Sequence, residues 1–336
     1  MKGKRITKKD LLDALKKFLK DELALLIAFE RDNKAFKIRA YKKDVPDICL
    51  FNPVYEANTA IYLRRIFSED FKILCIFRPC EARAYVELTK LTQVESRSVI
   101  CGSVDCFGTV SSKLDNIVFP ENPQDLKSFL ENSKNLRYAC MTCRLKNGVF
   151  GDFGLRIDSD WNLWVIPYTG KANVLYELIS SAESDLPREF LENQERNGQV
   201  FQSSLDEFKR DFDKCIMCLN CRDICPVCYC VDCVFNNDEY LPKGDALINS
   251  ILRSNDAQIP KNKEMYHFIR MYHVSQTCVG CGGCEEACPQ GIPLTKYYKG
   301  ISERLSGLFD YVSGRDFEEK IPYTTFREDE LPNADD

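Results

Sequence analysis

The chain has 336 residues, 44% of them hydrophobic, and a formal net charge of −5, so it can hold two domains with a sizeable core. Because no basic patch dominates and no apolar run approaches the roughly 20 residues that cross a bilayer, we expect neither a nucleic-acid partner nor a transmembrane segment. The start also lacks the apolar stretch of a secretory signal, which indicates a cytoplasmic protein.

Residues 1–182 are expected to form an α/β domain. Lys2, Lys4 and Arg5 are interpreted as a solvated lead-in to a helix that Thr7 caps, since apolar residues follow at helical spacing. Further helices are predicted over residues 56–67, 78–90, 120–135 and 171–181. Strands are predicted over residues 23–30, 35–41, 73–77, 99–101, 153–157 and 161–168. Their alternation with helices indicates parallel strands with ligands at their carboxyl ends.

Four cysteines of this domain lie where such ligands are expected. Cys80 and Cys106 each follow a predicted strand, and a C-x-x-C pair adds Cys140 and Cys143. The set predicts an iron–sulfur cluster, and the alternatives are a zinc site and inert or redox-active thiols. Three further cysteines are expected to be small apolar residues of the core: Cys49, Cys75 and Cys101.

The rest of the chain falls into three predicted parts. Residues 183–213 are charged and fit a connecting helix or linker. Residues 214–308 are expected to form an α+β two-cluster ferredoxin-like module with a helical insertion. Residues 309–336 form an acidic C-terminal tail with turn signals, for which wrapping around a partner and disorder both fit.

Two runs of the form C-x-x-C-x-x-C-x-x-x-C-P dominate the predicted module. A cubane cluster needs four thiolates; closely spaced cysteines supply three, and the fourth cysteine of each run usually ligates the other cluster. The expected crossing gives one [4Fe-4S] cluster these ligands: Cys215, Cys218, Cys221 and Cys288. It gives the second [4Fe-4S] cluster these: Cys278, Cys281, Cys284 and Cys225. With 18 cysteines and no secretory signal, the chain points to a reducing, oxygen-poor environment rather than to disulfides.

Three more cysteines follow the first run directly: Cys228, Cys230 and Cys233. They could ligate a further metal centre, replace Cys225, or belong to a docking surface. The two histidines, His267 and His273, do not share one helix face, so both binding one metal is not expected. We expect them to donate hydrogen bonds near a cluster, with Arg270 adding a positive charge that favours the reduced state.

Three short motifs occur in a fixed order over roughly residues 50–160: Arg78-Pro79-Cys80-Glu81-Ala82-Arg83-Ala84, Asp105-Cys106-Phe107-Gly108-Thr109 and Cys140-x-x-Cys143. This order, with the two runs and the ending Tyr311-Val312-Ser313-Gly314-Arg315, resembles the beta-subunit family of formate dehydrogenases and of hydrogenases that use the deazaflavin coenzyme F-420. The resemblance implies a bound FAD in the N-terminal domain, a third [4Fe-4S] cluster on the four cysteines of that domain, and a separate catalytic alpha subunit. The chain departs from the family at residues 144–148, where a more acidic or proline-bearing stretch is expected, and this bears on the deazaflavin pocket.

Flavin contacts are predicted at polar groups near helix starts and strand ends: Asn58, Thr59, Arg78 and Thr109. Ordinary helix capping is the alternative for the two threonines. The absence of a G-x-G-x-x-G fingerprint gives no support to a Rossmann-type NAD site.

The leading hypothesis is a flavin-containing iron–sulfur electron-transfer beta subunit of a multi-subunit oxidoreductase, working with a catalytic alpha subunit and other redox subunits. The reaction at the partner end of the electron path could be formate oxidation, hydrogen oxidation or a heterodisulfide-type reduction. One alternative is a flavin-free iron–sulfur wire that only docks partners. The other is a self-contained oxidoreductase that uses a flavin or coenzyme F-420.

Overall fold

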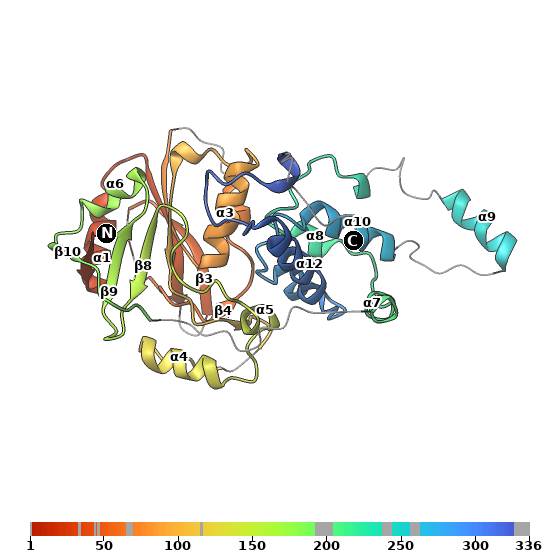
Figure 1. Cartoon of the computed structure of the whole chain (residues 1–336), viewed down its shortest axis with the longest axis horizontal. Coiled ribbons are helices and arrows are strands. Elements are labelled where there is room, and N and C mark those ends of the chain that lie inside the picture. Colours follow the sequence, from red (N-terminus) through yellow and green to blue (C-terminus); the bar gives the residue numbers. More distant parts are fainter. Residues whose placement is uncertain are drawn as a thin grey trace.

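The computed structural model describes residues 2–32, 35–43, 45, 48–64, 70–114, 117–191, 204–236, 244–255 and 263–325. Some predicted features lie partly outside these ranges: the end of the helix 56–67, much of the linker 183–213 and the last part of the tail 309–336. The described chain forms two parts side by side along its long axis, a sheet-containing N-terminal part and a helical C-terminal part (Figure 1).

Eight strands in the described residues of the N-terminal part form one mixed sheet in the order β10-β1-β9-β8-β6-β5-β2-β3. The strands are β1 (Lys2–Ile6), β2 (Ala24–Asp32), β3 (Ala35–Tyr41), β5 (Lys72–Phe77), β6 (Val99–Val104), β8 (Phe153–Ile157), β9 (Leu163–Pro167) and β10 (Glu183–Asp185). The central strands β2, β5, β6 and β8 are parallel, and β3, β9, β1 and β10 pair antiparallel at the two sides. A separate parallel pair joins β4 (Val54–Tyr55) to β7 (Val110–Ser111).

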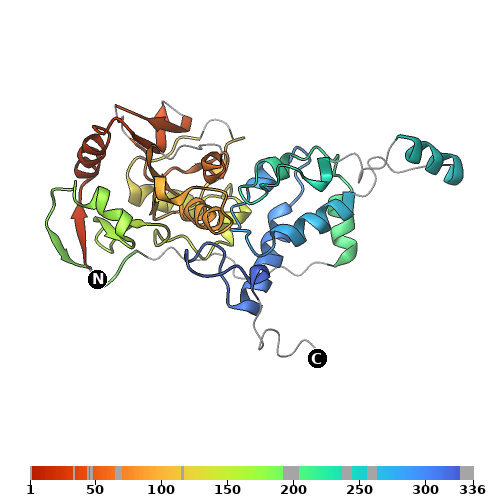
Figure 2. The same ribbon diagram turned by 90° about the horizontal axis from the view of Figure 1, so that it is seen from above.

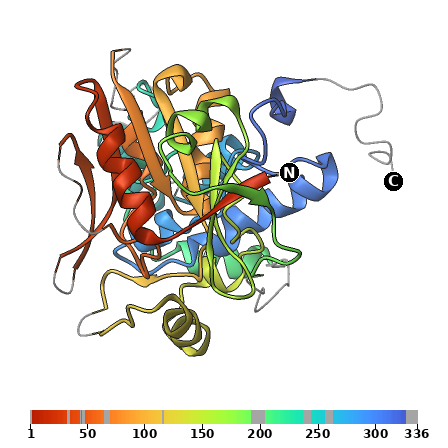
Figure 3. The ribbon, with the colours of Figure 1, turned by 90° about the vertical axis from the view of Figure 1, so that its left-hand side faces the viewer.

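Helices cover both faces of this sheet because its central strands are apolar on both sides. On one face, Leu74 and Ile76 of β5 share a core with α1 (Lys8–Phe18), which Thr7 caps with Asp10 in a capping box. On the other face, the alternate residues of β5 pack with α3 (Pro79–Lys90). Helix α1 lies on the outer side of the domain and α3 on the side of the helical part (Figures 1 and 3).

The first strand corrects one sequence interpretation. Residues 2–6 are not a solvated lead-in but pair with β9 and β10. The ammonium group of Lys4 donates hydrogen bonds to the carbonyl oxygens of Tyr176 and Ile179, both at 2.7 Å, which caps the end of a short helix. That helix is also shorter than expected: a 3-10 turn (Gly170–Ala172) and α6 (Asn173–Tyr176) occupy the start of the predicted range 171–181. Three other helices of this part are α2 (Ala60–Leu63), α4 (Pro123–Asn132) and α5 (Tyr138–Met141).

Helices and loops make up the described residues from 204 to 325, and no strand occurs among them. The helices are α7 (Leu205–Phe212), α8 (Asn220–Asp223), α9 (Gly244–Ser254), α10 (Lys263–Val274), α11 (Gly283–Glu286) and α12 (Leu294–Phe309). The expected α+β character is therefore not found there, because tight turns and single-turn helices carry the cysteine runs instead of strands. The helical insertion is present as α9 and α10, and α9 stands away from the other elements (Figures 1 and 2). None of the helices described for this chain is long and apolar enough to cross a bilayer.

The first part of the predicted tail packs on α3 of the N-terminal domain. The Glu87 carboxylate accepts hydrogen bonds from the Tyr311 hydroxyl at 2.6 Å and from the Gly314 amide at 2.5 Å. Arg83 donates to the carbonyl oxygen of Ser313 at 2.8 Å. Residues 310–325 therefore connect the helical part to the sheet domain within one chain.

Candidate metal centres

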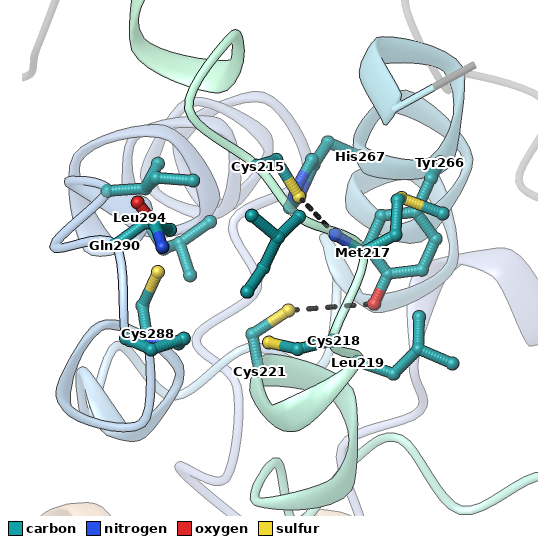
Figure 4. A pocket seen from close by; sticks show the side chains of 13 residues that line it. Cys215, Met217, Cys218, Leu219, Cys221, Tyr266, His267, Cys288, Gln290 and Leu294 are labelled. Carbon is teal, nitrogen blue, oxygen red and sulfur yellow. Dashed lines mark hydrogen bonds between the residues drawn. The ribbon is translucent and has the colours of Figure 1, made fainter. Parts of the chain in front are cut away.

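The four cysteines assigned to one cluster by the expected crossing line a single cavity (Figure 4). We call it the distal cavity; its cysteines are Cys215, Cys218, Cys221 and Cys288. Cys215 and Cys218 lie on the loop between α7 and α8, Cys221 lies in α8, and Cys288 follows α11. Apolar residues close the walls, among them Ile292 and Leu294. The donor set and the closed walls suit a cubane cluster.

The second group of four cysteines forms what we call the middle site. Cys225 lies close enough to the second run to influence the charge of both Cys278 and Cys284. Burial, followed by the neighbouring Cys225, raises the pKa of Cys278 to about 12. Cys225 is therefore a neighbour of the second run, as the expected crossing requires.

The four N-terminal cysteines line a further cavity, which we call the N-terminal cavity. Cys80 stands in the first turn of α3 directly after β5, and Cys106 follows β6. The carboxyl ends of parallel strands meet at one edge of the sheet, which is why these two cysteines come together. Helix α5 brings Cys140 and the loop after it brings Cys143.

The protonation of these thiols indicates what the sites need. Burial raises the pKa of Cys80 and of Cys143, and it raises the pKa of Cys106 to about 12. Thiolates in such surroundings are stable only when cationic metal compensates their charge. Among the described residues, however, no group of three His, Cys, Asp or Glu side chains converges on one ion.

Cys281 joins the middle site to the N-terminal cavity, since it belongs to the second run and also lines that cavity. Arg137 donates a hydrogen bond to the Cys281 carbonyl oxygen at 3.2 Å. Glycines make this contact feasible: a Cβ at Gly282 would lie 2.6 Å from Cβ of Ala139 and 2.7 Å from Nη2 of Arg137. The three cysteine sites therefore stand in the order N-terminal, middle, distal.

Hydrogen-bond donors surround the sulfur atoms of the distal cavity. Nε2 of His267 lies 3.4 Å from Sγ of Cys215, and its Nδ1 lies 3.1 Å from the Tyr298 hydroxyl. Burial lowers the pKa of His267 to about 3, so the ring is neutral. The Tyr266 hydroxyl lies 3.5 Å from Sγ of Cys221. His273, in contrast, is exposed, so the two histidines do not share a site.

Arg270 is buried between the distal cavity and the middle site. Its Nη2 donates a hydrogen bond to the Cys221 carbonyl oxygen at 2.8 Å, and its guanidinium lies over the Tyr298 ring at 4.5 Å. The same charge acts on Cys225 and Cys284 of the middle site. Its guanidinium also contacts the Cys228 thiol and the Tyr298 hydroxyl.

The residues predicted to contact a flavin do not gather around a site of their own. Arg78 and Thr109 line the N-terminal cavity, where Thr109 Oγ1 lies 3.2 Å from Sγ of Cys140. Arg78 forms a buried ion pair with Glu81 at 2.9 Å. Asn58 and Thr59 line neither cysteine cavity: Asn58 donates to the Cys80 carbonyl oxygen at 3.2 Å, and the Thr59 amide donates to Glu81 at 3.3 Å.

The three cysteines after the first run meet different neighbours. The thiols of Cys228 and Cys225 are hydrogen-bonded, and this contact lowers the pKa of Cys228 to about 7. Cys233 is hydrogen-bonded to Arg222, and Cys230 is exposed. Cys228 thus lies beside the middle site, while the other two point elsewhere.

Sequence reasoning missed several polar residues around the N-terminal cavity. Arg137 stacks on the Tyr55 ring at 3.7 Å, and both line the cavity. Lys299 of α12 donates to the Thr142 hydroxyl at 2.7 Å, next to the C-x-x-C pair. Only Arg137 carried a sequence signal, its place just before that pair.

A comparison with known protein families agrees with the two C-terminal cysteine runs. Residues 211–292 match the family model of the 4Fe-4S dicluster domain. The chain is 26% identical over 291 residues to the F420-dependent formate dehydrogenase subunit beta of Methanocaldococcus jannaschii, with 71% of this chain and 73% of that protein covered. It is 24% identical over 299 residues to the F420-dependent formate dehydrogenase 1 subunit beta of Methanococcus maripaludis, covering 72% of each chain.

A shorter match, 26% identical over 157 residues, joins it to the sulfhydrogenase 2 subunit beta of Pyrococcus furiosus and covers 37% of this chain and 45% of that protein. These matches confirm the resemblance found in the sequence motifs. The chain is therefore similar to beta subunits of F420-dependent formate dehydrogenases, and its residues 211–292 match a 4Fe-4S dicluster domain.

Proposed function

We propose that this chain is the iron–sulfur electron-transfer subunit of a multi-subunit oxidoreductase and holds three [4Fe-4S] clusters in a row. The observation that carries the proposal is the double position of Cys281, which belongs to the run of the middle site and lines the N-terminal cavity. Bound clusters supply one-electron exchange at these sites. The chain's own part is to hold the thiolates, exclude water and place positive charge, above all Arg270, beside them.

Iron analysis tests the number of clusters. Anaerobically purified protein should contain about twelve iron atoms and as much acid-labile sulfide if all three sites hold [4Fe-4S] clusters, and about eight if only the dicluster domain does. Iron content near zero after anaerobic purification and reconstitution would overturn the proposal as a whole.

We further propose that the chain acts with a catalytic alpha subunit and that FAD, with coenzyme F-420 as its reaction partner, belongs to the N-terminal domain. Two relatives support the alpha subunit and coenzyme F-420, since both are beta subunits of F420-dependent formate dehydrogenases. The proposal of FAD rests on the resemblance of the sequence motifs. A bound flavin would supply hydride exchange coupled to one-electron steps. The residues predicted to contact it are engaged within the protein, so no step is assigned to them.

Two measurements separate this from the alternatives. Flavin released by anaerobic denaturation supports the flavin-containing subunit, and a colour due to iron and sulfide alone supports the flavin-free wire. Rapid reduction of the isolated chain by reduced coenzyme F-420 would favour a self-contained oxidoreductase. A cytoplasmic location stays a prediction from the sequence.

A further inference from the structure

We propose that the loop of the first cysteine run, residues 215–221, is the docking surface for a separate redox protein, whose contacting surface is apolar and lies over a cysteine-ligated cluster. The proposal rests on the proposed function, because it needs a cluster in the distal cavity. It commits to one loop, which we call the distal loop, and to one kind of partner.

The distal loop carries a predicted cluster ligand that is exposed to solvent. Of the twelve cysteines assigned to the three clusters, all within the described residues, Cys218 is the exposed one. An electron must enter or leave a protein where a redox centre approaches the surface. The distal loop is the place where a cluster of this chain would do so.

The equivalent loop of the second run already packs against another part of the chain, the N-terminal domain. The two loops share their backbone form: Met217 and Leu219 have φ of 56° and 62°, and Gly280 and Gly282 have 67° and 71°. The second loop is covered by the N-terminal domain, whose own cysteine cavity lies directly behind it. Within this chain, a cysteine cavity of another domain, the N-terminal cavity, thus already packs against a loop of this form.

The two loops differ in how far an equivalent apolar side chain is exposed. Val279 is 6% exposed in the covered loop, whereas Ile216, at the same place in the first run, is 53% exposed. The first run also keeps Met217 and Leu219 at positive φ, where glycine would avoid backbone strain. Both side chains line the distal cavity, so Ile216 is the apolar side chain that the distal loop leaves for a partner.

The charges beside the distal loop indicate the kind of partner surface that it fits. The acidic residues next to the distal loop are already paired: Asp213 with Lys263 at 3.0 Å, and Asp223 with Arg222 at 2.7 Å. An apolar loop flanked by neutralised acids suits an apolar partner surface better than a strongly charged one. Association through this loop should therefore depend weakly on salt.

The proposed reaction at this surface is the transfer of a single electron. One electron leaves the centre of one protein and one electron reduces the centre of the other, and no bond is made or broken. The chain contributes the position of Cys218 and an apolar surface from which water is excluded.

The test uses the full-length protein reconstituted anaerobically with iron and sulfide, and a purified bacterial two-cluster ferredoxin as the redox protein. We compare Ile216→Asp with Ile248→Asp on α9, because Ile248 is 57% exposed and so closely matches Ile216 at 53%. Ile216→Ser repeats the test without an added charge. The readout is the second-order rate at which reduced ferredoxin bleaches the cluster absorption, with dithionite as a small reductant in parallel.

We expect Ile216→Asp to slow reduction by ferredoxin about tenfold, because a carboxylate must then be buried in the contact. Reduction by dithionite should not change, the iron content should stay that of the wild type, and Ile248→Asp should react like the wild type. Equal rates for Ile216→Asp and the wild type, or equal slowing by both aspartates, would overturn the docking surface. A shift from dimer to monomer caused by Ile216→Asp would show instead that a second copy covers the loop. Failure of dithionite to bleach the wild type would overturn the proposed function.

Discussion

The guanidinium of Arg270 bonds to the backbone of one cysteine run while its charge acts on the other. Its Nη2 donates to the Cys221 carbonyl oxygen at 2.8 Å, and the same charge lies beside Cys225 and Cys284. A reduced cluster carries one more negative charge than an oxidised one. A buried cation between two clusters therefore raises both reduction potentials.

Replacing Arg270 with glutamine should lower the midpoint potentials of the distal and middle clusters. The expected shift is on the order of 60 mV, which corresponds to about 1.4 kcal/mol for one electron. A potentiometric titration followed by electron paramagnetic resonance measures it. Arg270→Lys should shift the potentials less, and Arg188→Gln, at an exposed position of the N-terminal domain, should leave them unchanged. Unchanged potentials in Arg270→Gln would contradict this role.

The neighbouring thiols of Cys225 and Cys228 give a second prediction. Cys225 acts on Cys278 and Cys284 of the second run, whereas Cys228 is hydrogen-bonded to Cys225 and to Arg270. Cys225→Ala should therefore lose the middle cluster, about four iron atoms, and Cys228→Ala should keep its iron. The reverse pattern in iron analysis would identify Cys228 as the ligand that replaces Cys225.

The contact between Gly314 and Arg83 gives a prediction about stability. Gly314 has φ of +74°, and a Cβ there would lie 2.2 Å from the Arg83 carbonyl oxygen. Gly314→Ala should lower the free energy of unfolding by about 2–4 kcal/mol, through backbone strain and the clash together. Gly291→Ala is the matched control, because Gly291 also has positive φ, +61°, but meets nothing within 4 Å.

Thermal unfolding of the anaerobic protein compares the two variants. In the control, the free energy of unfolding should fall only by the part due to backbone strain, about 1–2 kcal/mol. Equal losses in both variants would mean that the segment after α12 does not press on α3 as the structure has it.

Sequence patterns predicted much of the sheet and the grouping of the cysteines. Apolar runs and alternation identified the strands that became β2, β3, β5, β6, β8 and β9. The rule that ligands follow the carboxyl ends of parallel strands placed Cys80 and Cys106 at one edge. Cysteine spacing alone grouped Cys215 with the distant Cys288, and the distal cavity contains both.

Other features depend on contacts that a linear pattern does not contain. Strand β1 is rich in lysine and pairs only because β9 and β10 offer it two edges. The packing of Tyr311 on Glu87 joins residues more than 200 positions apart, so turn signals in the tail could not predict it. The approach of Gly282 to Ala139 is likewise visible only when both parts are folded.

The most direct test of three clusters in one chain is iron analysis of the wild type beside Cys80→Ala, both purified without oxygen. Cys80 lines the N-terminal cavity and does not belong to either C-terminal run. We predict about twelve iron atoms in the wild type and about eight in the variant, with unchanged signals from the dicluster domain. About eight iron atoms in both proteins would contradict a cluster in the N-terminal cavity and leave a two-cluster chain.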